Sequence, residues 1–440
     1  MFLSIKMPEV PGNVEKLDDT SIYKSPDESL IVIPRSGGPR KSNINQPTST
    51  SKLTENFLFI SDIHILGPKN SILDRLWHET HMKIHYKSIN FILNLSQNWS
   101  KNYSKFILGD IFDYGMFYSI TDSKSNEYWK NRFKNTKNAE ERKQFSKIMQ
   151  SYTDFQHDLK TFYSIFSDAH VILGNHDVAF PMNTNTFRIE RMNQVFGRRL
   201  TCELLFAEKN SAVPFSVLNS SGFSKLSREK EIYQNSMACL ENLSEILQNP
   251  NKIITKNSKD SKIYSSMING TIPETKSNLQ LRPILLQHFP LWRQNDEICR
   301  SDLPDSAKNN ERHSSNSPSR EALDQNISKI ILEKLKPELI LSGHTHNGCY
   351  REHKIEIKTE NNTKHDLTIP EISVASFNYR NRDNPVFMLV TISENHIVIS
   401  KNLVGRQSSI IVRYLIFFLV IIIRVFYQNF ERAKKNHKQY

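Results

Sequence analysis

Cysteine and glycine are both scarce in this chain of 440 residues, which has four cysteines and 13 glycines. No CxxC pair exists, which argues against a structural zinc knuckle, and four cysteines are too few for a disulfide-built scaffold. One bridge is possible if the domain is lumenal. Cys299 and Cys349 are then the preferred pair, because each lies shortly after a segment of candidate metal ligands.

Sustained apolar periodicity is missing from residues 1–52, which are rich in proline. We predict that this segment is mostly disordered and holds no signal peptide or membrane anchor. The composition, with 38% hydrophobic and 24% charged residues, predicts one large folded domain. We place this domain at residues 53–402, with polar loop insertions near 249–277 and 301–319.

A dense basic stripe is also absent, although the net charge is +12. Such a charge suits nucleic acid, a membrane surface or an anionic substrate as a partner. The positive residues are spread over the N-terminal segment, residues 124–147 and the last residues, without interleaved aromatic residues. We interpret them as solvated surface and expect no nucleic acid as a partner.

One long apolar run stands near the C-terminus, at residues 410–426. It is about long enough to cross a bilayer and is apolar on every face, so we predict a transmembrane helix followed by a basic tail at 427–440. Arg413 and Arg424 lie near its ends, where long side chains can reach the interface. The alternatives are an interfacial amphipathic helix and a buried core helix.

Short buried strands alternate with helical segments in the rest of the chain, which predicts an α/β fold with a central sheet. Helical periodicity covers residues 72–99 and 126–166, and we expect the second of these helices to be exposed. Ligands in such folds collect at the carboxyl ends of strands. The expected strands, each followed at once by a polar block, are residues 57–60, 105–108, 170–173, 283–287 and 339–341.

The five polar blocks contain aspartate and histidine, one asparagine and no cysteine. This ligand set suits Mn²⁺, Fe and Zn²⁺. Two such ions clamp an in-line displacement at phosphorus, so the blocks predict a two-metal phosphoesterase. The blocks are Ser61-Asp62-Ile63-His64, Gly109-Asp110-Ile111-Phe112-Asp113, Gly174-Asn175-His176-Asp177, Gln287-His288 and Gly343-His344-Thr345-His346.

These blocks resemble the D-x-H, G-D-x-x-D, G-N-H-D/E, H and G-H-x-H signature of the calcineurin-like metallophosphoesterase superfamily. The resemblance implies a β-sandwich flanked by helices and two divalent metal ions. It implies that His176 is the general acid and that Asp113 orients it, while we interpret Asp177 as structural. The implied ligands are Asp62, His64 and His346 for the first ion, Asp110 as a bridge, and Asn175, His288 and His344 for the second ion.

A closer resemblance, to the metallophosphoesterase 1 family, covers most of residues 55–400. It implies manganese and removal of an ethanolamine-phosphate side branch from a mannose of GPI anchors, so the implied partners are GPI-anchored proteins and the membrane. The implied location is the early secretory pathway, at ER exit sites, the ER–Golgi intermediate compartment and the cis-Golgi, as a single-pass or multi-pass membrane protein. It rests on segments that include Asn185–Arg191, Leu286–Arg293 and Ser376–Pro385.

The chain departs from this family in two ways. Members usually have a hydrophobic segment near the N-terminus as well, and this sequence shows only the C-terminal one, which leaves the orientation of the catalytic domain open. The family often ends in a dilysine retrieval signal, of which only Lys438 is in place. Glycosylation sequons at Asn94, Asn219 and Asn326 permit a lumenal domain, but an Asn-rich chain also forms them by chance.

Several further residues are candidates for functional roles. His78, His81 and His85 share one helical face, which we interpret as a solvated or packed face. Arg380 and Arg382 are either a phosphate clamp or a pair in a surface loop. We expect Phe187, Arg188 and Arg191 to position the loop after Asn175.

Other functions are weighed against this one. A nuclease should show a basic groove. A protein serine/threonine phosphatase carries Arg after the second block and Glu after the GNH histidine, where this chain has Tyr114 and Asp177. A non-catalytic trafficking scaffold of the same fold typically loses ligands or the catalytic histidine, which are all present here.

Overall fold

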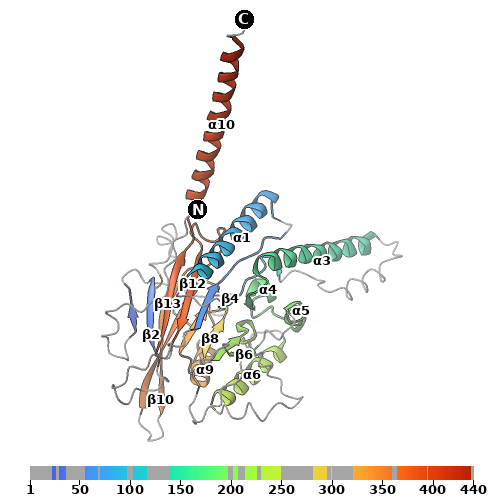
Figure 1. Cartoon of the computed structure of the whole chain (residues 1–440). Helices are drawn as coiled ribbons and strands as arrows, with labels where there is room; N and C mark the ends of the chain where they lie inside the picture. The colour runs from blue at the N-terminus through green and yellow to red at the C-terminus, as the bar shows by residue number, and fades with distance from the viewer. Residues whose placement is uncertain are drawn as a thin grey trace, which may run out of the picture.

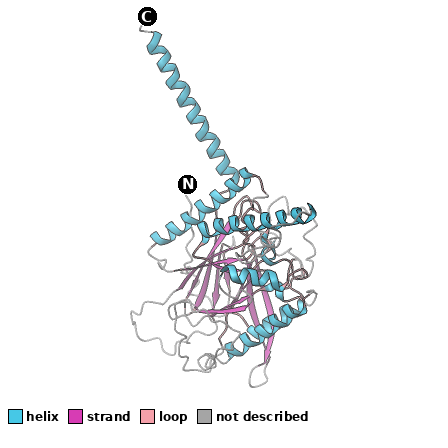
Figure 2. Ribbon diagram, turned by 90° about the vertical axis from the view of Figure 1, so that its right-hand side faces the viewer, coloured by secondary structure: helices cyan, strands magenta, loops and turns pink. Residues whose placement is uncertain are grey.

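Two β-sheets packed face to face form the centre of the molecule, and helices cover their outer sides (Figure 1). Figure 2 shows the strands enclosed between helices, with the C-terminal helix α10 leaving the domain. The computed structural model describes residues 22–25, 29–35, 55–67, 70–96, 103–115, 139–196, 202–206, 214–224, 229–248, 281–294, 299, 321–358, 364–393 and 395–437.

The first sheet has seven strands in the order β1-β2-β13-β12-β3-β4-β5. Its strands β3, β4 and β5 run parallel, so their carboxyl ends lie on one edge. The remaining pairs are antiparallel. The strands are β1 (Tyr23–Lys24), β2 (Leu30–Pro34), β3 (Glu55–Ile60), β4 (Ser104–Leu108), β5 (His170–Ile172), β12 (Val386–Ile392) and β13 (His396–Leu403).

The second sheet has six strands in the order β10-β11-β9-β8-β7-β6. Strands β7, β8, β9 and β11 are parallel to their neighbours in this series, while β6 and β10 close the two edges in antiparallel pairs. The strands are β6 (Cys202–Phe206), β7 (Pro214–Leu218), β8 (Ile284–Gln287), β9 (Leu339–Ser342), β10 (Cys349–Lys358) and β11 (Lys364–Ser373).

The helices pack on the outer faces of both sheets. Residues of α1, α3 and α5 share one buried apolar cluster with the first sheet, and residues of α6 and α9 share another with the second. The Ser71 side chain accepts from Asp74 N and so caps α1 at its start. The helices are α1 (Ile72–Leu95), α3 (Ala139–Phe166), α4 (Asn175–Val178), α5 (Thr186–Phe196), the 3₁₀ turn η3 (Ser220–Gly222), α6 (Lys230–Gln248), α9 (Gln325–Leu335) and α10 (Gln407–His437).

The core between the sheets is rich in aromatic residues. Phe59 and Phe106 from the first sheet stack with ring centroids 5.1 Å apart, and Phe215 from the second meets Phe57 at 4.9 Å. All four rings are buried. Because each inner-facing ring removes a large apolar area from water, this layer fixes the two sheets against each other and thereby fixes the loops at their shared edge.

The structure confirms the predicted sandwich flanked by helices and all five expected strands. The predicted disorder of residues 1–52 is wrong at Leu30–Pro34, which forms β2 beside β13 and buries Ile31, Val32 and Ile33. This apolar run is too short to show a period. It forms a strand because the edge of β13 provides backbone hydrogen bonds and the neighbouring core buries its side chains.

The predicted exposed helix over 126–166 also needs correction. Within the described residues α3 begins at Ala139, and Phe155, Phe162 and Phe166 are buried against the first sheet. The early part of the prediction and the two insertions at 249–277 and 301–319 lie outside the described residues.

The predicted transmembrane segment is a continuous helix. α10 runs from Gln407 to His437, and residues 407–432 are long and apolar enough to cross a membrane. Only residues 404–406 separate it from β13. Its first turn is fastened to the domain, since Gln407 N donates to Asp383 O and Ile410 is buried. Most of the predicted basic tail is helical as well, and Lys438 lies outside the described residues.

Two disulfides join the four cysteines. The predicted Cys299–Cys349 bridge is present, and a second one, which the sequence did not suggest, links Cys202 to Cys239. The first bridge ties β10, directly after the last ligand block, to the chain beyond the His288 block. The second ties β6 to α6. Both bridges are typical of a domain that folds in an oxidising compartment.

Candidate metal centre

The loops that follow the parallel strands meet at one edge of the two sheets. β3 and β4 of the first sheet and β8 and β9 of the second each end at a ligand block. Backbone hydrogen bonds join these loops, since Asp62 N donates to Gly109 O and Gly343 N donates to His288 O. The sequence prediction that the polar blocks collect at the carboxyl ends of strands is thereby confirmed.

Five of the candidate ligands hold the left-handed backbone conformation that non-glycine residues seldom adopt. Each such residue costs about 1–2 kcal/mol, so the surrounding packing must hold it in place. Among the other non-glycine residues described, only Ala179 and Lys336 also have a positive φ. Backbone strain is thus concentrated where function is expected. The φ angles are 51° at Asp62, 41° at His64, 50° at Asp110, 71° at His344 and 59° at His346.

Two glycines allow the ligand loops to approach one another. Gly109 has a φ of 88°, and a Cβ at this position would collide with the His288 ring. A Cβ on Gly174 would collide with the backbone nitrogen and carboxylate of Asp110. The glycine at the head of each of these blocks is therefore required by the close packing of the neighbouring ligand.

The Asp110 carboxylate lies at the centre of the site and is buried. Its Oδ1 lies 3.3 Å from His288 Nε2, and its Oδ2 lies 3.6 Å from His64 Nε2. The backbone N–H of His176 donates to Oδ1 over 2.8 Å and fixes the carboxylate. One carboxylate oxygen thus faces each half of the site, as the predicted bridging role requires.

One half of the site contains Asp62, His64 and His346. His346 Nε2 lies 3.2 Å from His64 Nε2 and 3.9 Å from Asp62 Oδ1. These three residues and Asp110 offer ligand atoms that all lie within 4.8 Å of one another. The N–H of His344 donates to Asp62 Oδ1 over 3.1 Å, which links the first ligand block to the last.

The other half of the site contains Asn175, His288 and His344. His288 Nε2 lies 3.1 Å from Asn175 Oδ1, and the ligand atoms of Asp110, His288 and His344 lie within 4.8 Å of one another. The seven residues predicted as metal ligands are therefore brought together in two adjoining groups that share Asp110.

The donor atoms fit a pair of cations. His288 Nδ1–H donates to Leu108 O over 2.7 Å, so the bare Nε2 would face oxygens of Asn175 and Asp110, three electron-rich atoms around one point. Burial lowers the pKa of His288, but Asp110 outweighs it and raises that pKa to about 9. Asp62 Oδ2 is buried and has no hydrogen-bond partner among the described residues. Both observations indicate a place for positive charge.

His176 lies beside this cluster and is partly exposed. Its ring stands edge-on to His64, with centroids 4.6 Å apart. His176 Nδ1–H donates to the backbone carbonyl of Asp113 over 2.8 Å, which leaves Nε2 to carry the exchangeable proton.

The predicted role of Asp113 needs correction in one respect. Its carboxylate is 4.0 Å from His176 Nδ1 and accepts instead from Arg380, while also lying 3.6 Å from His64 Nδ1. Asp113 therefore holds His176 through its main chain, while its side chain binds Arg380 and faces His64. Burial opposes ionisation of Asp113, but the nearby His64 and Arg380 lower its pKa.

Asp177 is structural, as the sequence suggested. Its buried carboxylate accepts from the backbone nitrogens of Ile111, Phe112 and Gly174, and so joins the second and third ligand blocks. Burial and the nearby Asp110 raise the pKa of Asp177 to about 6. Arg191, also buried, donates to the carbonyls of Gly115 and Asp177. The predicted positioning role of Arg191 is thus confirmed.

Sequence reasoning missed how much the segment Ser376–Pro385 supports the site. Ser376 Oγ donates to Asp62 O, and Asn378 Nδ2 donates to Ile63 O over 2.6 Å. The Arg380 guanidinium lies against Asp113, and Arg382 contacts the carbonyl of His346. This polar segment follows β11 and precedes β12, and its position after a strand was the available signal.

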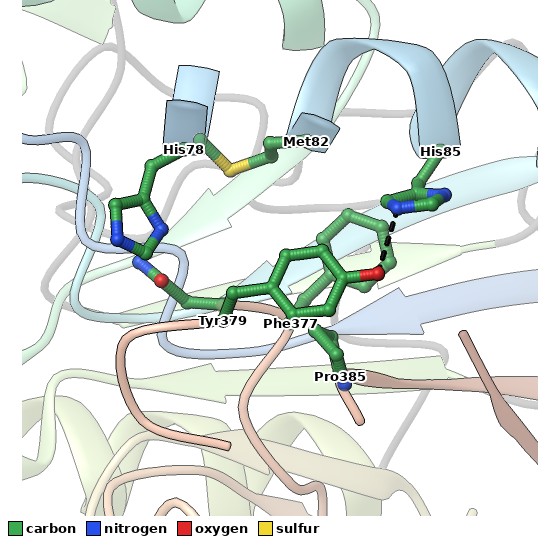
Figure 3. A pocket seen from close by; sticks show the side chains of 7 residues that line it. His78, Met82, His85, Phe377, Tyr379 and Pro385 are labelled. Carbon is green, nitrogen blue, oxygen red and sulfur yellow. Dashed lines mark hydrogen bonds between the residues drawn. The ribbon is translucent and has the colours of Figure 1, made fainter. Parts of the chain in front are cut away.

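The histidines of α1 form a packed face, as predicted. His81 and His85 are buried, and His85 Nε2 lies 2.8 Å from the Tyr379 hydroxyl, which itself donates to Gly405 O. Figure 3 shows His78, Met82 and His85 from α1 lying over Phe377 and Tyr379. Among the described residues, these histidines belong to no cluster with metal-binding geometry.

The profile of the calcineurin-like phosphoesterase family matches residues 55–348, and the chain belongs to this family. It is therefore a phosphoric ester hydrolase of a family with a dinuclear divalent metal site, for which the clustered aspartates and histidines provide ligands.

Curated relatives carry the name Metallophosphoesterase 1. The protein from Danio rerio is 29% identical over 358 residues, which cover 81% of this chain and 77% of the relative. The one from Ailuropoda melanoleuca is 28% identical and covers 94% of this chain and 86% of its own length. The one from Gallus gallus is 28% identical, with 84% and 76% covered. The similarity thus extends well beyond the ligand blocks.

Proposed function

We propose that this chain is a membrane-anchored two-metal phosphodiesterase that removes the ethanolamine-phosphate side branch from a mannose of GPI anchors. This reaction would support the transport of GPI-anchored proteins from the ER to the Golgi. The observation that carries the hydrolase chemistry is the central Asp110 carboxylate, with one oxygen toward each group of candidate ligands. The substrate rests on the resemblance of the segments around the site to the metallophosphoesterase 1 family.

In this proposal Asp62, His64 and His346 would hold one ion, and Asn175, His288 and His344 would hold the other. Asp110 would be a ligand that the two ions share. The oxygen and nitrogen donors suit Mn²⁺, which the resemblance also implies. When bound, two divalent ions lower the pKa of a water nucleophile and neutralise charge on the phosphate oxygens.

His176 is the proposed proton donor of the reaction. Water attacks phosphorus, the bond from phosphorus to the mannose oxygen breaks, and His176 Nε2 protonates that leaving oxygen. The carbonyl of Asp113 holds Nδ1–H and so leaves Nε2 as the nitrogen that gives up a proton. Arg380, which is 45% exposed beside Asp113, is placed to meet a phosphate oxygen with the guanidinium edge that Asp113 does not occupy.

Two further features favour a lumenal, membrane-anchored enzyme of the early secretory pathway. α10 is long and apolar enough to cross a membrane, and almost all of its residues between 407 and 432 are exposed or half-exposed. Both disulfides belong to the domain that carries the site, which suits the oxidising lumen in which GPI anchors are found.

The test is to disrupt the gene and analyse the glycans of mature GPI anchors by mass spectrometry. Extra ethanolamine-phosphate on a mannose is the expected result, with reversal by the intact gene and no reversal by a His176→Ala copy. Unchanged anchors in the disrupted cells would exclude this substrate. In that case, hydrolysis of a soluble phosphodiester by the purified enzyme would still show whether the site catalyses metal-dependent phosphodiester hydrolysis, independently of the natural substrate.

A further inference from the structure

Helix α1 carries an apolar stripe on the side that faces away from the domain. Leu73 is 79% exposed, Phe91 is 64% exposed and Leu95 is 66% exposed, and Leu76 and Ile84 continue the stripe between them. The successive spacings of three, eight, seven and four residues place all five side chains on one helical face. A stripe of this length is more apolar exposure than a soluble helix normally presents.

The fold itself does not need this stripe. The opposite face of α1 buries Met82, Tyr86, Ile89 and Leu93 in the core of the domain. A helix that is apolar on both faces normally packs each face against an apolar environment, because contact of apolar side chains with water is unfavourable. Thr80 and Lys87 are also on the exposed side. The long lysine side chain can lie along an apolar surface and extend its charge toward phosphate groups.

The stripe begins beside the base of α10. Tyr414, in the second turn of α10, makes edge-on ring contacts with Trp77 and His81 of α1, at centroid distances of 6.0 and 6.1 Å. Figure 2 shows α1 leading away from the base of α10 across the domain instead of running alongside it. Because the first turn of α10 is fixed to the domain at Asp383, the position of α1 relative to the apolar helix is set by the fold.

We infer that α1 lies in the interfacial layer of the bilayer that α10 crosses, with Leu73, Leu76, Ile84, Phe91 and Leu95 inserted among the lipids. The occupant of the stripe is thus the lipid surface. The contact between α1 and α10 supports this choice. Because the start of α1 lies beside Tyr414, near the start of α10, a bilayer around α10 would have its surface at the level of α1. Interfacial helices combine an apolar face of this kind with nearby lysines. The inference rests on that part of the proposed function in which α10 spans a membrane.

The inserted helix would also determine where substrate meets the site. The inner face of α1 lies over the segment Ser376–Pro385, through the hydrogen bond between His85 and Tyr379 and the contacts that line a small pocket with His78 and Met82 (Figure 3). The next residue after Tyr379 is Arg380, which contacts Asp113 of the site. A short packed connection therefore links the lipid surface to the metal centre, which suits a phosphodiester that is itself linked to a lipid.

Fluorescence quenching tests this placement on the full chain. All four cysteines are paired in disulfides, so one introduced cysteine gives a unique thiol for an environment-sensitive fluorophore. Labels at Leu76→Cys and Phe91→Cys report α1, and a label at Leu419→Cys reports α10. A label at Lys329→Cys on α9, where the side chain is 71% exposed, is the control. The proteins are reconstituted into phosphatidylcholine vesicles that contain nitroxide-labelled lipid, and iodide serves as the aqueous quencher.

The expected result is that nitroxide lipid quenches the labels at positions 76, 91 and 419 and that iodide does not reach them. The label at 329 should show the reverse. If 419 is quenched by lipid while 76 and 91 are open to iodide, α10 spans the membrane and the inference fails alone. If 76 and 91 are shielded from iodide without lipid quenching, a protein covers the stripe and the inference is wrong. If 419 is not quenched, the membrane part of the proposed function fails together with the inference.

An activity measurement with matched variants gives a second test. The double variant Leu76→Gln/Phe91→Gln should hydrolyse a soluble phosphodiester, bis(4-nitrophenyl) phosphate, at the wild-type rate. On a lipid-linked phosphodiester in vesicles its rate should fall several-fold, while Lys329→Gln behaves as wild type on both substrates. Equal rates of the double variant and the wild type on the vesicle substrate would contradict the inference, and loss of the soluble activity would reveal a folding defect that the quenching experiment avoids.

Discussion

Arg380 Nη1 donates to Asp113 Oδ2 over 2.6 Å and thereby ties the segment after β11 to the second ligand block. The same carboxylate faces His64, one of the candidate ligands, from 3.6 Å. Arg380 thus acts on the site through Asp113 as well as through any phosphate it meets.

Replacing Arg380 should therefore slow the enzyme without unfolding it. We expect Arg380→Met to lower kcat/KM for a soluble phosphodiester by about 10- to 100-fold, a range usual for residues that support metal ligands. Arg380→Lys should recover little, because a single ammonium cannot reproduce the planar fork. Arg406→Met, at an exposed position near α10, is the control. Wild-type kinetics in Arg380→Met would show that this pair is a surface contact only.

The proposed general acid can be separated from metal binding. His176→Ala should reduce turnover by on the order of 10²- to 10⁴-fold, because the leaving oxygen then departs without a positioned proton donor. The metal content of the purified variant, measured by plasma mass spectrometry, should stay at the wild-type level. Activity within tenfold of wild type would assign the proton donor elsewhere.

Gly174 offers a test of the close packing around Asp110. A Cβ at this position would collide with the backbone nitrogen and carboxylate of Asp110, so Gly174→Ala should displace the central carboxylate and sharply weaken metal binding. Gly222→Ala is the matched control, since its Cβ would meet the Ser236 hydroxyl, the end of a side chain that can turn away. Titration of Mn²⁺ into metal-free protein compares the two. Equal affinity in both variants would rule out this steric role for Gly174.

Acid should weaken the contact between α1 and Tyr379. Burial, with a smaller contribution from His81, lowers the pKa of His85 from an ordinary 6.5 to about 4. The unfolded chain then binds a proton that the folded chain does not, so stability is complete above pH 6.5 and declines as the pH falls toward 4. The slope should be on the order of 1 kcal/mol per pH unit.

Thermal melts of metal-free protein at pH 7, 6 and 5 measure this effect. His85→Gln keeps a side-chain N–H for Tyr379 but does not titrate, so its Tm should fall less steeply with acidification than that of the wild type. Parallel curves for the two proteins would mean that His85 does not contribute to the acid sensitivity.

The disulfides provide a test of orientation. If the catalytic domain is lumenal, intact microsomes should contain a chain in which a maleimide reagent finds no free thiol until reductant is added. Reduction should then expose all four cysteines, and protease added outside sealed microsomes should spare the domain. Four thiols that react before reduction, together with protease cleavage, would place the domain in the cytosol.

Much of the site could be predicted because its candidate ligands lie in short segments with characteristic residue types and spacing. An Asp-x-His or Gly-Asp-x-x-Asp block keeps its residue types and spacing wherever the strand before it ends. The order of blocks therefore predicted the strands and which side chains would lie together. The supporting contacts could not be predicted in this way. Whether His176 contacts the main chain or the carboxylate of Asp113 depends on distances of about 1 Å, and the pairing of Arg380 with Asp113 joins residues more than 250 positions apart.

The fold shows the same division. Strands with continuous apolar runs, such as β4 and β8, were predicted because burial on both faces leaves a clear signal. β2 was missed because it becomes a strand only when β13 is present as its partner. The apolar outer stripe of α1 could not be predicted from the sequence. The helix has apolar residues on more than one face, and the sequence does not show which of these faces packs against the domain.

The direct junction of β13 and α10 fixes the distance between the catalytic domain and the start of α10. Residues 404–406 are the whole connection. Val404 within it and Ile410 in the first turn of α10 are buried, so the domain has no long flexible tether. If α10 spans a membrane as proposed, the metal centre stands at one distance from the lipid. We then expect the enzyme to select phosphodiesters by their distance from the bilayer as well as by their chemistry.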